Sequence, residues 1–227
     1  MINYACLRQS SSASWLAKQL TPSSRDAFRE QLSIIESGVV TADDILNAAT
    51  PQTPLDWLSL VLLLDQVPRN CYRGPVAKTA FTVFDPIALA ITLRAIENGI
   101  PEIPPIRYYA GYRLWFYLPL QHSEEPKIHE LSMRENARIF TDIKALVDGP
   151  DTIAEGNNSM KYCRNFLSEN RDGIERWETM LLSFASRHKV IIDRFGRYPH
   201  RNEAMGRKST EEELKYLAEG GETFTSG

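Results

Sequence analysis

Apolar residues recur along most of the chain at steps of three and four, the spacing of amphipathic helices. The clearest case has apolar residues at 174, 177, 181, 184, 188, 191 and 192, with His188 as its polar exception, and predicts a long helix from about residue 172. Residues 55–67 are apolar nearly all round, which predicts a central buried helix that Pro68 ends or kinks. No segment alternates for long at a period of two. The pattern predicts an all-α fold of roughly eight to ten helices in short hairpin pairs.

Capping residues and prolines set the expected helix boundaries. Asp85-Pro86 predicts an N-cap with proline at the first helical position, and Asn98-Gly99 predicts the end of that helix. The same reasoning gives the other helices, with starts and stops at Ser23 or Ser24 to Ser37, Thr41 to Pro51, Pro105 to Pro119, Pro126 to Gly149, and a capping box at 209–212 followed by Gly220.

Length and composition favour one globular domain. The chain has 227 residues, of which 43% are hydrophobic and 24% charged, as in ordinary soluble domains. We expect the domain to span residues 15–224, after a poorly ordered N-terminal arm over residues 1–14 that ends in serines. Three widely spaced cysteines suggest free thiols in a reducing compartment. The chain shows no signal peptide and no apolar run of ~20 residues, so we expect a cytoplasmic protein with no membrane partner.

Charge is distributed unevenly along the sequence. The net charge of −3 provides no general field for nucleic acid, and no nucleic-acid partner is expected. Residues 187–208, however, carry seven Lys or Arg against two acids, and five glutamates with one lysine follow from residue 209. Because the basic segment has an acidic neighbour, it predicts a local binding site for a small anionic molecule or peptide rather than a long basic stripe.

Three apolar helices end in a similar way, each with polar residues immediately past the core. Their ends read Asp-Gln-Val-Pro-Arg-Asn at 65–70, Pro-Leu-Gln-His-Ser-Glu at 119–124 and Asp-Arg-Phe-Gly-Arg-Tyr-Pro-His-Arg-Asn at 193–202. If these ends converge, they build one anion-binding site, because guanidinium groups match carboxylates and phosphates. The candidate ligand-binding residues are Asp65, Arg69, Asn70, Arg73, Asp193, Arg194, Arg197, Arg201, Asn202 and Arg207.

The candidate acid–base groups are His122, Glu124 and His200. A His–Glu pair can act as a general base and the group that orients it. A metal shared by these side chains is a weaker hypothesis, since no HExxH or other recognised ligand spacing is present, and we assign no metal. The alternative is a hydrogen-bonded network that only fastens the loop. The sequence identifies no cofactor.

Asp65 and Asp193 each continue an apolar run, so we expect both carboxylates to be partly buried and therefore paired. Arg69 and Arg197 lie four residues further on, within reach of helical ion pairs. The alternative interpretation is that both pairs are structural and lock the helix ends.

Two further residues are expected behind the site. His188 falls on the apolar face of its helix, where a histidine is more often part of the core. Cys71 lies between two arginines, which would favour its thiolate, but it has no evident base partner.

These motifs resemble the family known as domain of unknown function 924. The resemblance rests on residues 62–74 (Leu-Leu-Leu-Asp-Gln-Val-Pro-Arg-Asn-Cys-Tyr-Arg-Gly), 116–124 (Phe-Tyr-Leu-Pro-Leu-Gln-His-Ser-Glu), and 193–202 with Gly206-Arg207 and Ser-Thr-Glu-Glu at 209–212. It covers about residues 55–224, and the segment 149–172 looks like an insertion. The resemblance implies an all-helical, tetratricopeptide-repeat-like, right-handed array and implies no activity.

Two functional hypotheses follow. In the first, an Arg/His/Asp-lined pocket binds a small anionic ligand or substrate, with possible acid–base catalysis by His122, Glu124 and His200. In the alternative, a helical scaffold binds a protein or peptide partner in a concave groove and the polar residues are purely structural. The sequence indicates neither the ligand nor the oligomeric state.

Overall fold

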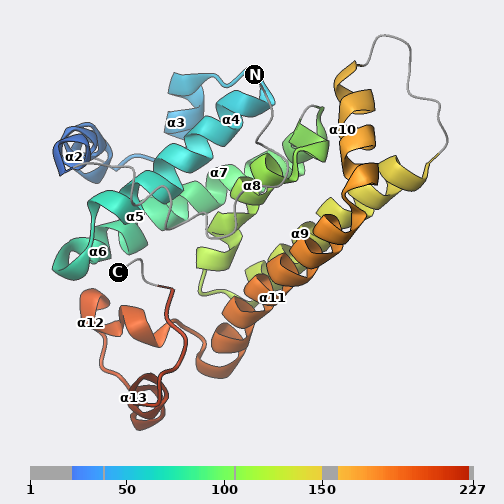
Figure 1. Ribbon diagram of the computed structural model, residues 1–227. Helices are drawn as coiled ribbons and strands as arrows, with labels where there is room; N and C mark the ends of the chain where they lie inside the picture. The colour runs from blue at the N-terminus through green and yellow to red at the C-terminus, as the bar shows by residue number, and fades with distance from the viewer. Residues whose placement is uncertain (1–21, 38, 105, 150–157, 225–227) are drawn as a thin grey trace.

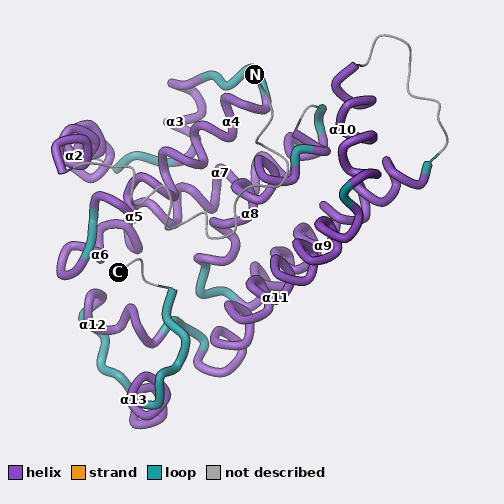
Figure 2. Tube along the Cα trace, in the orientation of Figure 1, coloured by secondary structure: helices purple, strands orange, loops and turns teal. Residues whose placement is uncertain are grey.

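The computed structural model describes residues 22–37, 39–104, 106–149 and 158–224, and these form α-helices joined by short loops (Figures 1 and 2). No strand occurs in these ranges, which confirms the all-α class. Most of the helices share one large hydrophobic core, as in a single domain. The helices are α2 (Pro22–Ser37), α3 (Ala42–Ala49), α4 (Pro54–Val61), α5 (Val67–Cys71), α6 (Ala77–Thr79), α7 (Asp85–Glu97), α8 (Ala110–His122), α9 (Pro126–Asp148), α10 (Asn158–Glu169), α11 (Arg171–Phe195), α12 (Asn202–Met205) and α13 (Glu211–Ala218). Short π-helical and 3₁₀ segments connect several of them, at Leu62–Gln66 (η1), Gly74–Val76, Ala80–Phe84 (η3), Ile100–Glu102, Ile106–Tyr108 and Pro199–Arg201 (η6).

The long helices α9 and α11 lie side by side along one flank of the molecule (Figure 1). Helix α8 packs on α9, and α7 packs on both α8 and α4, so consecutive layers of helices share one core. The short helices α12 and α13 form a small unit at the C-terminal end of α11, and α12 contacts α6 (Figure 1).

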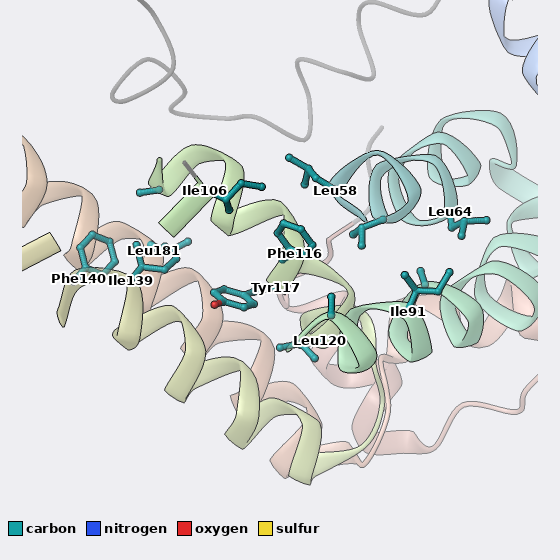
Figure 3. Packing of buried hydrophobic residues seen from close by; sticks show 14 of the residues in the cluster. Leu58, Leu64, Ile91, Ile106, Phe116, Tyr117, Leu120, Ile139, Phe140 and Leu181 are labelled. Carbon is teal, nitrogen blue, oxygen red and sulfur yellow. The ribbon is translucent and has the colours of Figure 1, made fainter. Parts of the chain in front are cut away.

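The core is continuous between the first helices and the α9–α11 pair. Figure 3 shows Leu64 and Ile91 at one end, Phe116 in the middle, and Ile139 and Phe140 at the other end. Each of these five side chains is 0% exposed, so burial of apolar surface holds the helices together.

Most helix boundaries follow the predicted caps. A capping box at Thr41 begins α3, and Gly99, with a φ of 66°, follows the end of α7. The capping box before α13 begins at Thr210, one residue later than predicted, with Glu213 as its partner. The predicted stop at Pro119 was wrong, because α8 continues through this buried proline to His122.

The two prolines at 68 and 86 also lie inside continuous helical paths, and each comes two residues after a π-helical segment. Proline lacks a backbone N–H and its ring crowds the carbonyl four residues earlier, so a wider π turn relieves the conflict. Asp85 is therefore not an N-cap as predicted, since the residue before it is already helical and no side chain caps this position. Its carboxylate is free to pair elsewhere.

Gly74–Glu97 is one stretch of the described chain that passes a length and composition test for a membrane span, with a mean hydropathy of 1.5. A third (33%) of its most apolar stretch is buried, and Phe84, Ala88 and Ile91 are 0% exposed in the core. Helices that pack in the core of a globular protein can be equally long and apolar, so this property is weak evidence for a membrane span.

The predicted N-terminal arm and residues 150–157 lie outside the described residues. Helix α10 lies within the segment 149–172 that the resemblance marked as an insertion.

Candidate functional site: a buried polar cluster

Five charged or titratable side chains meet at the junction of the first helices with the C-terminal unit. They come from η1 (Asp65), α5 (Arg69), the first residue of α7 (Asp85), the last residue of α8 (His122) and η6 (Arg201), and we call them the central cluster. Both aspartates lie within or directly after a π-helical segment, and such segments occur frequently at functional sites.

Asp65 is the most deeply buried member, with 1% of its side chain exposed. Its Oδ1 lies 2.6 Å from Nδ1 of His122 and 3.6 Å from Nε of Arg69. The amide of Gln66 donates to its other oxygen. Burial by itself raises the pKa of this carboxyl, but the nearby His122 and Arg69 outweigh it and lower the pKa to about 2. Asp65 is therefore ionised at neutral pH. The predicted pair with Arg69 is confirmed.

Asp85 links the two arginines of the cluster. Its Oδ1 accepts a hydrogen bond from Nη2 of Arg69, and its Oδ2 lies 3.4 Å from Nη1 of Arg201. The same Nη1 donates to the backbone carbonyl of His122 over 3.0 Å. The Arg201 guanidinium lies over the rings of Phe81 and Tyr198, 4.6 and 4.5 Å from their centroids.

These surroundings set the protonation of His122. Burial lowers the pKa of its imidazole, the charge of Arg69 lowers it further, and Asp65 opposes both effects. The side chain is 15% exposed. With Nδ1 against an ionised carboxylate, the neutral ring carries its proton on Nδ1, and Nε2 has no hydrogen-bond partner in the described part of the chain.

Tyr198 connects the central cluster to Glu124. Its backbone N–H donates to Oε1 of Glu124 over 2.9 Å, and its hydroxyl donates to the carbonyl of Gln121. Arg207 holds both oxygens of the same glutamate, at 2.6 and 3.0 Å. Glu124 therefore fixes the loop after α11 in place, and the structure gives no contact between this carboxylate and the imidazole of His122.

His200 borders the cluster on the other side of Tyr198. Burial, together with the charge of Arg201, lowers the pKa of its imidazole to about 4. Its Nδ1 is buried and has no hydrogen-bond partner among the described residues. The ring centroids of Tyr198 and His200 are 5.5 Å apart.

The part of the third predicted helix end that precedes the turn at Gly196 does not join the cluster. Asp193 is exposed and pairs with Lys189 at 2.7 Å, so the predicted Asp193–Arg197 pair was wrong. Arg197 makes a bidentate contact with Glu213 on α13, at 2.6 and 2.8 Å. Asp193 lies two residues before the end of α11, whereas Arg197 lies beyond the glycine turn at Gly196, so the two side chains face different directions, which explains the error.

Two more predicted ligand residues also belong to the α13 contact. Arg194 is exposed and pairs with Glu212 over 2.8 Å. Asn202 is buried and donates to Oε2 of Glu213 over 3.2 Å. These contacts fasten α13 onto the loop that follows α11.

The remaining candidates extend from α5. Asn70 donates to the carbonyl of Gln66 over 2.8 Å, and Arg73 donates to Oδ1 of Asn70 at the same distance. Cys71 is buried, and burial raises the pKa of its thiol despite the neighbouring arginines. The expectation of a favoured thiolate was therefore wrong.

All four histidines of the chain gather around the Tyr198 side of the cluster. The ring centroids of His129 and His188 lie 6.3 and 6.1 Å from that of Tyr198. His188 is 2% exposed and its Nδ1 donates to the carbonyl of Phe184 over 2.9 Å, which agrees with the predicted core position. Sequence reasoning missed Asp85, His129 and Tyr198. Tyr198 lies within the 193–202 motif, and this position in the sequence could have identified it as a site residue.

Within the described residues, no group of three or more His, Cys, Asp or Glu side chains could hold a metal ion. A shallow depression of about 450 Å³ lies on α11, lined by Asp172, Glu175, Arg176 and Thr179. At 1.5 Å per residue, it is roughly 30 Å along the helix from the central cluster. It is therefore not the predicted site.

The fold and the cluster together define an all-helical, single-domain protein with a buried network of ion pairs. The chain belongs to the family DUF924, described as bacterial protein of unknown function, whose profile matches residues 8–221. This confirms the resemblance, and the match begins nearer the N-terminus than the motifs alone indicated. A solved structure, the protein of unknown function ATU0120 from Agrobacterium tumefaciens, is similar with a TM-score of 0.56 and 25% identity, covering 93% of this chain and 88% of that one. A comparison with proteins of curated function gave no match.

Proposed function

We propose that the central cluster binds a small anionic molecule and that His122, oriented by Asp65, exchanges a proton with it. One observation carries the proposal. His122 turns Nδ1 to a buried, ionised carboxylate and leaves Nε2 without a hydrogen-bond partner among the described residues, while Arg69 pairs with the same carboxylate and Arg201 donates to the backbone carbonyl of His122. A side chain that only fastened a loop would need no unpaired ring nitrogen in a polar cluster that contains two arginines.

The acid–base part of the proposal follows from the tautomer. Asp65 accepts a hydrogen bond from the N–H at Nδ1 of His122. The free lone pair of the neutral ring is therefore on Nε2. The lowered pKa of His122 keeps that nitrogen unprotonated at neutral pH, which suits a general base. The pairing differs from the His122–Glu124 pair suggested by the sequence, because Glu124 is occupied by Arg207.

The anion part of the proposal follows from Arg201. Its nearest carboxylate oxygen is 3.4 Å away, its Nε is buried and has no hydrogen-bond partner in the described chain, and burial lowers the pKa of its guanidinium. It shares Asp85 with Arg69, which also pairs with Asp65, so Arg201 has only this shared carboxylate among the described residues. A carboxylate or phosphate oxygen of a ligand would supply the missing acceptor, and charge-assisted bonds of this kind are strong.

We also propose the finer features of the fold. The successive packing of α7, α8, α9 and α11 supports a tetratricopeptide-repeat-like, right-handed array. Two described cysteines, Cys71 and Cys163, are free, which supports the cytoplasm as the location. The scaffold hypothesis gains less support, since exposed apolar residues such as Ile34, Val190 and Leu214 are spread over different helices.

The test is a thermal-shift screen with acetate, succinate, citrate, orthophosphate, glycerol phosphate and a dipeptide. We compare the wild-type protein with His122→Asn and Arg201→Lys, which change the cluster while keeping polarity or charge. Arg194→Gln is the control, because it removes an arginine outside the cluster. At about 100 times its dissociation constant, a ligand stabilises the fold by about 2.7 kcal/mol.

We expect at least one anion to stabilise the wild-type and Arg194→Gln proteins but neither cluster variant. A shift of equal size in all four proteins would place binding elsewhere. If no anion stabilises the wild type, the cluster is structural and the proposal is wrong.

A further inference from the structure

We propose that the C-terminal segment from Gly220 to Phe224 is a strap that covers the histidine side of the central cluster and limits entry to it. We call these residues the C-terminal strap. They follow α13 and return across the end of α11, toward the middle of the molecule in Figure 1.

The strap reaches the cluster through Phe224. Its ring stacks on that of His188 with a centroid distance of 3.4 Å and an interplanar angle of 13°. It also meets Tyr198 and His200 edge-on, at 6.0 and 6.3 Å. The ring of Tyr198 in turn lies over the Arg201 guanidinium, 4.5 Å from its centroid. One aromatic ring therefore separates the strap from the cation proposed to bind the anion.

The turn that sends the strap back is built into the sequence. Gly220 has a φ of +80°, a conformation that other residues adopt only with strain. A Cβ atom at Gly221 would lie 2.4 Å from the backbone oxygen of Tyr216, so this position accepts only glycine without a shift. The N–H of Gly221 donates to that same oxygen over 2.8 Å. The strap thus starts from a defined turn.

Its further attachments are few and near the surface. Glu222 pairs with Arg187, whose side chain is 50% exposed, and its carbonyl accepts from the Tyr216 hydroxyl over 3.2 Å. Exposed ion pairs contribute little, and Phe224 is only half-buried. A segment held by one ring, one exposed ion pair and two hydrogen bonds to Tyr216 can open locally while the rest of the domain stays folded. Its role as a gate rests on the proposed function, whereas its covering of the histidines does not.

The test measures how fast diethyl pyrocarbonate modifies each histidine of the full-length protein, located by mass spectrometry. The reagent attacks neutral imidazole, and His188 and His200, whose pKa values are about 3 and about 4, are neutral at pH 7, so their rates report access. Phe224→Ala removes the ring. Arg187→Gln removes the surface pair of the strap, with Arg194→Gln as its matched control, since Arg194 is also 50% exposed and paired on α13.

We expect Phe224→Ala to raise the modification rates of His188 and His200 about tenfold through local opening. Arg187→Gln should raise these rates roughly two- to fivefold, because the loss of one exposed ion pair makes local opening easier by about that factor. Arg194→Gln should leave the rates unchanged. His129, which makes no ring contact with Phe224, is the internal control. Unchanged rates in both Phe224→Ala and Arg187→Gln would overturn the inference.

Orthophosphate and succinate binding are measured on the same variants. Faster modification with no anion bound by any variant would uphold the strap and contradict the proposed function. Faster association of an anion with Phe224→Ala than with the wild type would support both.

Discussion

Asp65 and Asp193 end apolar runs in the same way in the sequence, yet the structure predicts that replacing them has very different effects. The side chain of Asp65 is 1% exposed and contacts two basic groups, whereas that of Asp193 is 48% exposed and pairs with one lysine. Asparagine is nearly isosteric with aspartate and removes only the charge. Asp65→Asn and Asp193→Asn therefore form a matched pair.

The magnitude for Asp65 comes from its pKa. The folded protein lowers this pKa from 3.8 to about 2, and each pKa unit corresponds to about 1.4 kcal/mol, so the charged form contributes about 2 kcal/mol to the free energy of unfolding. For a domain of this size, that is a fall of roughly 4–8 °C in melting temperature. Asp193→Asn should change stability by less than about 0.5 kcal/mol.

The assay is urea unfolding of the three proteins between pH 3 and pH 7. The folded pKa of Asp65 lies below its unfolded value, so its contribution is complete above about pH 5 and is lost as the pH falls toward 2. The difference between wild type and Asp65→Asn should therefore be constant from pH 5 to 7 and about half as large at pH 3. A difference that does not depend on pH, or an equal effect of the two substitutions, would show that the charge of Asp65 does not stabilise the fold.

Three further predictions concern stability and can be checked by the same unfolding assay. Arg197→Met should lower the free energy of unfolding by about 2–3 kcal/mol, because the carboxylate of Glu213 that it holds is 2% exposed. Arg194→Met should lower it by less than about 1 kcal/mol, because its pair with Glu212 is exposed. Equal losses would contradict the difference between a buried and an exposed pair. Arg113→Met should cost about 3–5 kcal/mol, since this 0% exposed guanidinium compensates the buried carboxylate of Asp142 between α8 and α9. A loss below about 1 kcal/mol would contradict that role. His188 and His200 have folded pKa values of about 3 and about 4, below the unfolded value of 6.5, so the unfolded chain binds more protons in acid. Stability should be complete above pH 6.5 and fall by about 1.4 kcal/mol per pH unit for each histidine down to about pH 4; a flat profile between pH 6.5 and 5 would contradict it.

The fold was largely predictable because helix signals are local. The periodicity of α11 and the caps at Thr41 and Asn98 each depend on a few neighbouring residues. The π-helical segments before Pro68 and Pro86 were not predictable in this way. They reflect a compromise between a proline that disfavours the helix and core packing that maintains it, and packing is not visible in the local sequence.

The site was predicted less completely. Convergence of two helix ends was correct, since Asp65 and His122 meet, but the third end contributes only residues beyond the turn, such as Arg201. Asp85 was assigned to a cap because Asp-Pro is a common helix start, and its true partners lie 16 and 116 residues away. Pairings over such distances are set by tertiary structure.

The role of His122 can be measured by a ¹⁵N NMR titration of the four histidines, with and without each anion of the panel. We expect His122 to carry its proton on Nδ1 at pH 7 and to titrate below 6.5, and we expect a bound anion to raise its pKa and to shift its signals more than those of His129. A His122 that titrates near 6.5 and responds to no anion would show that it is not the acid–base group of an anion site.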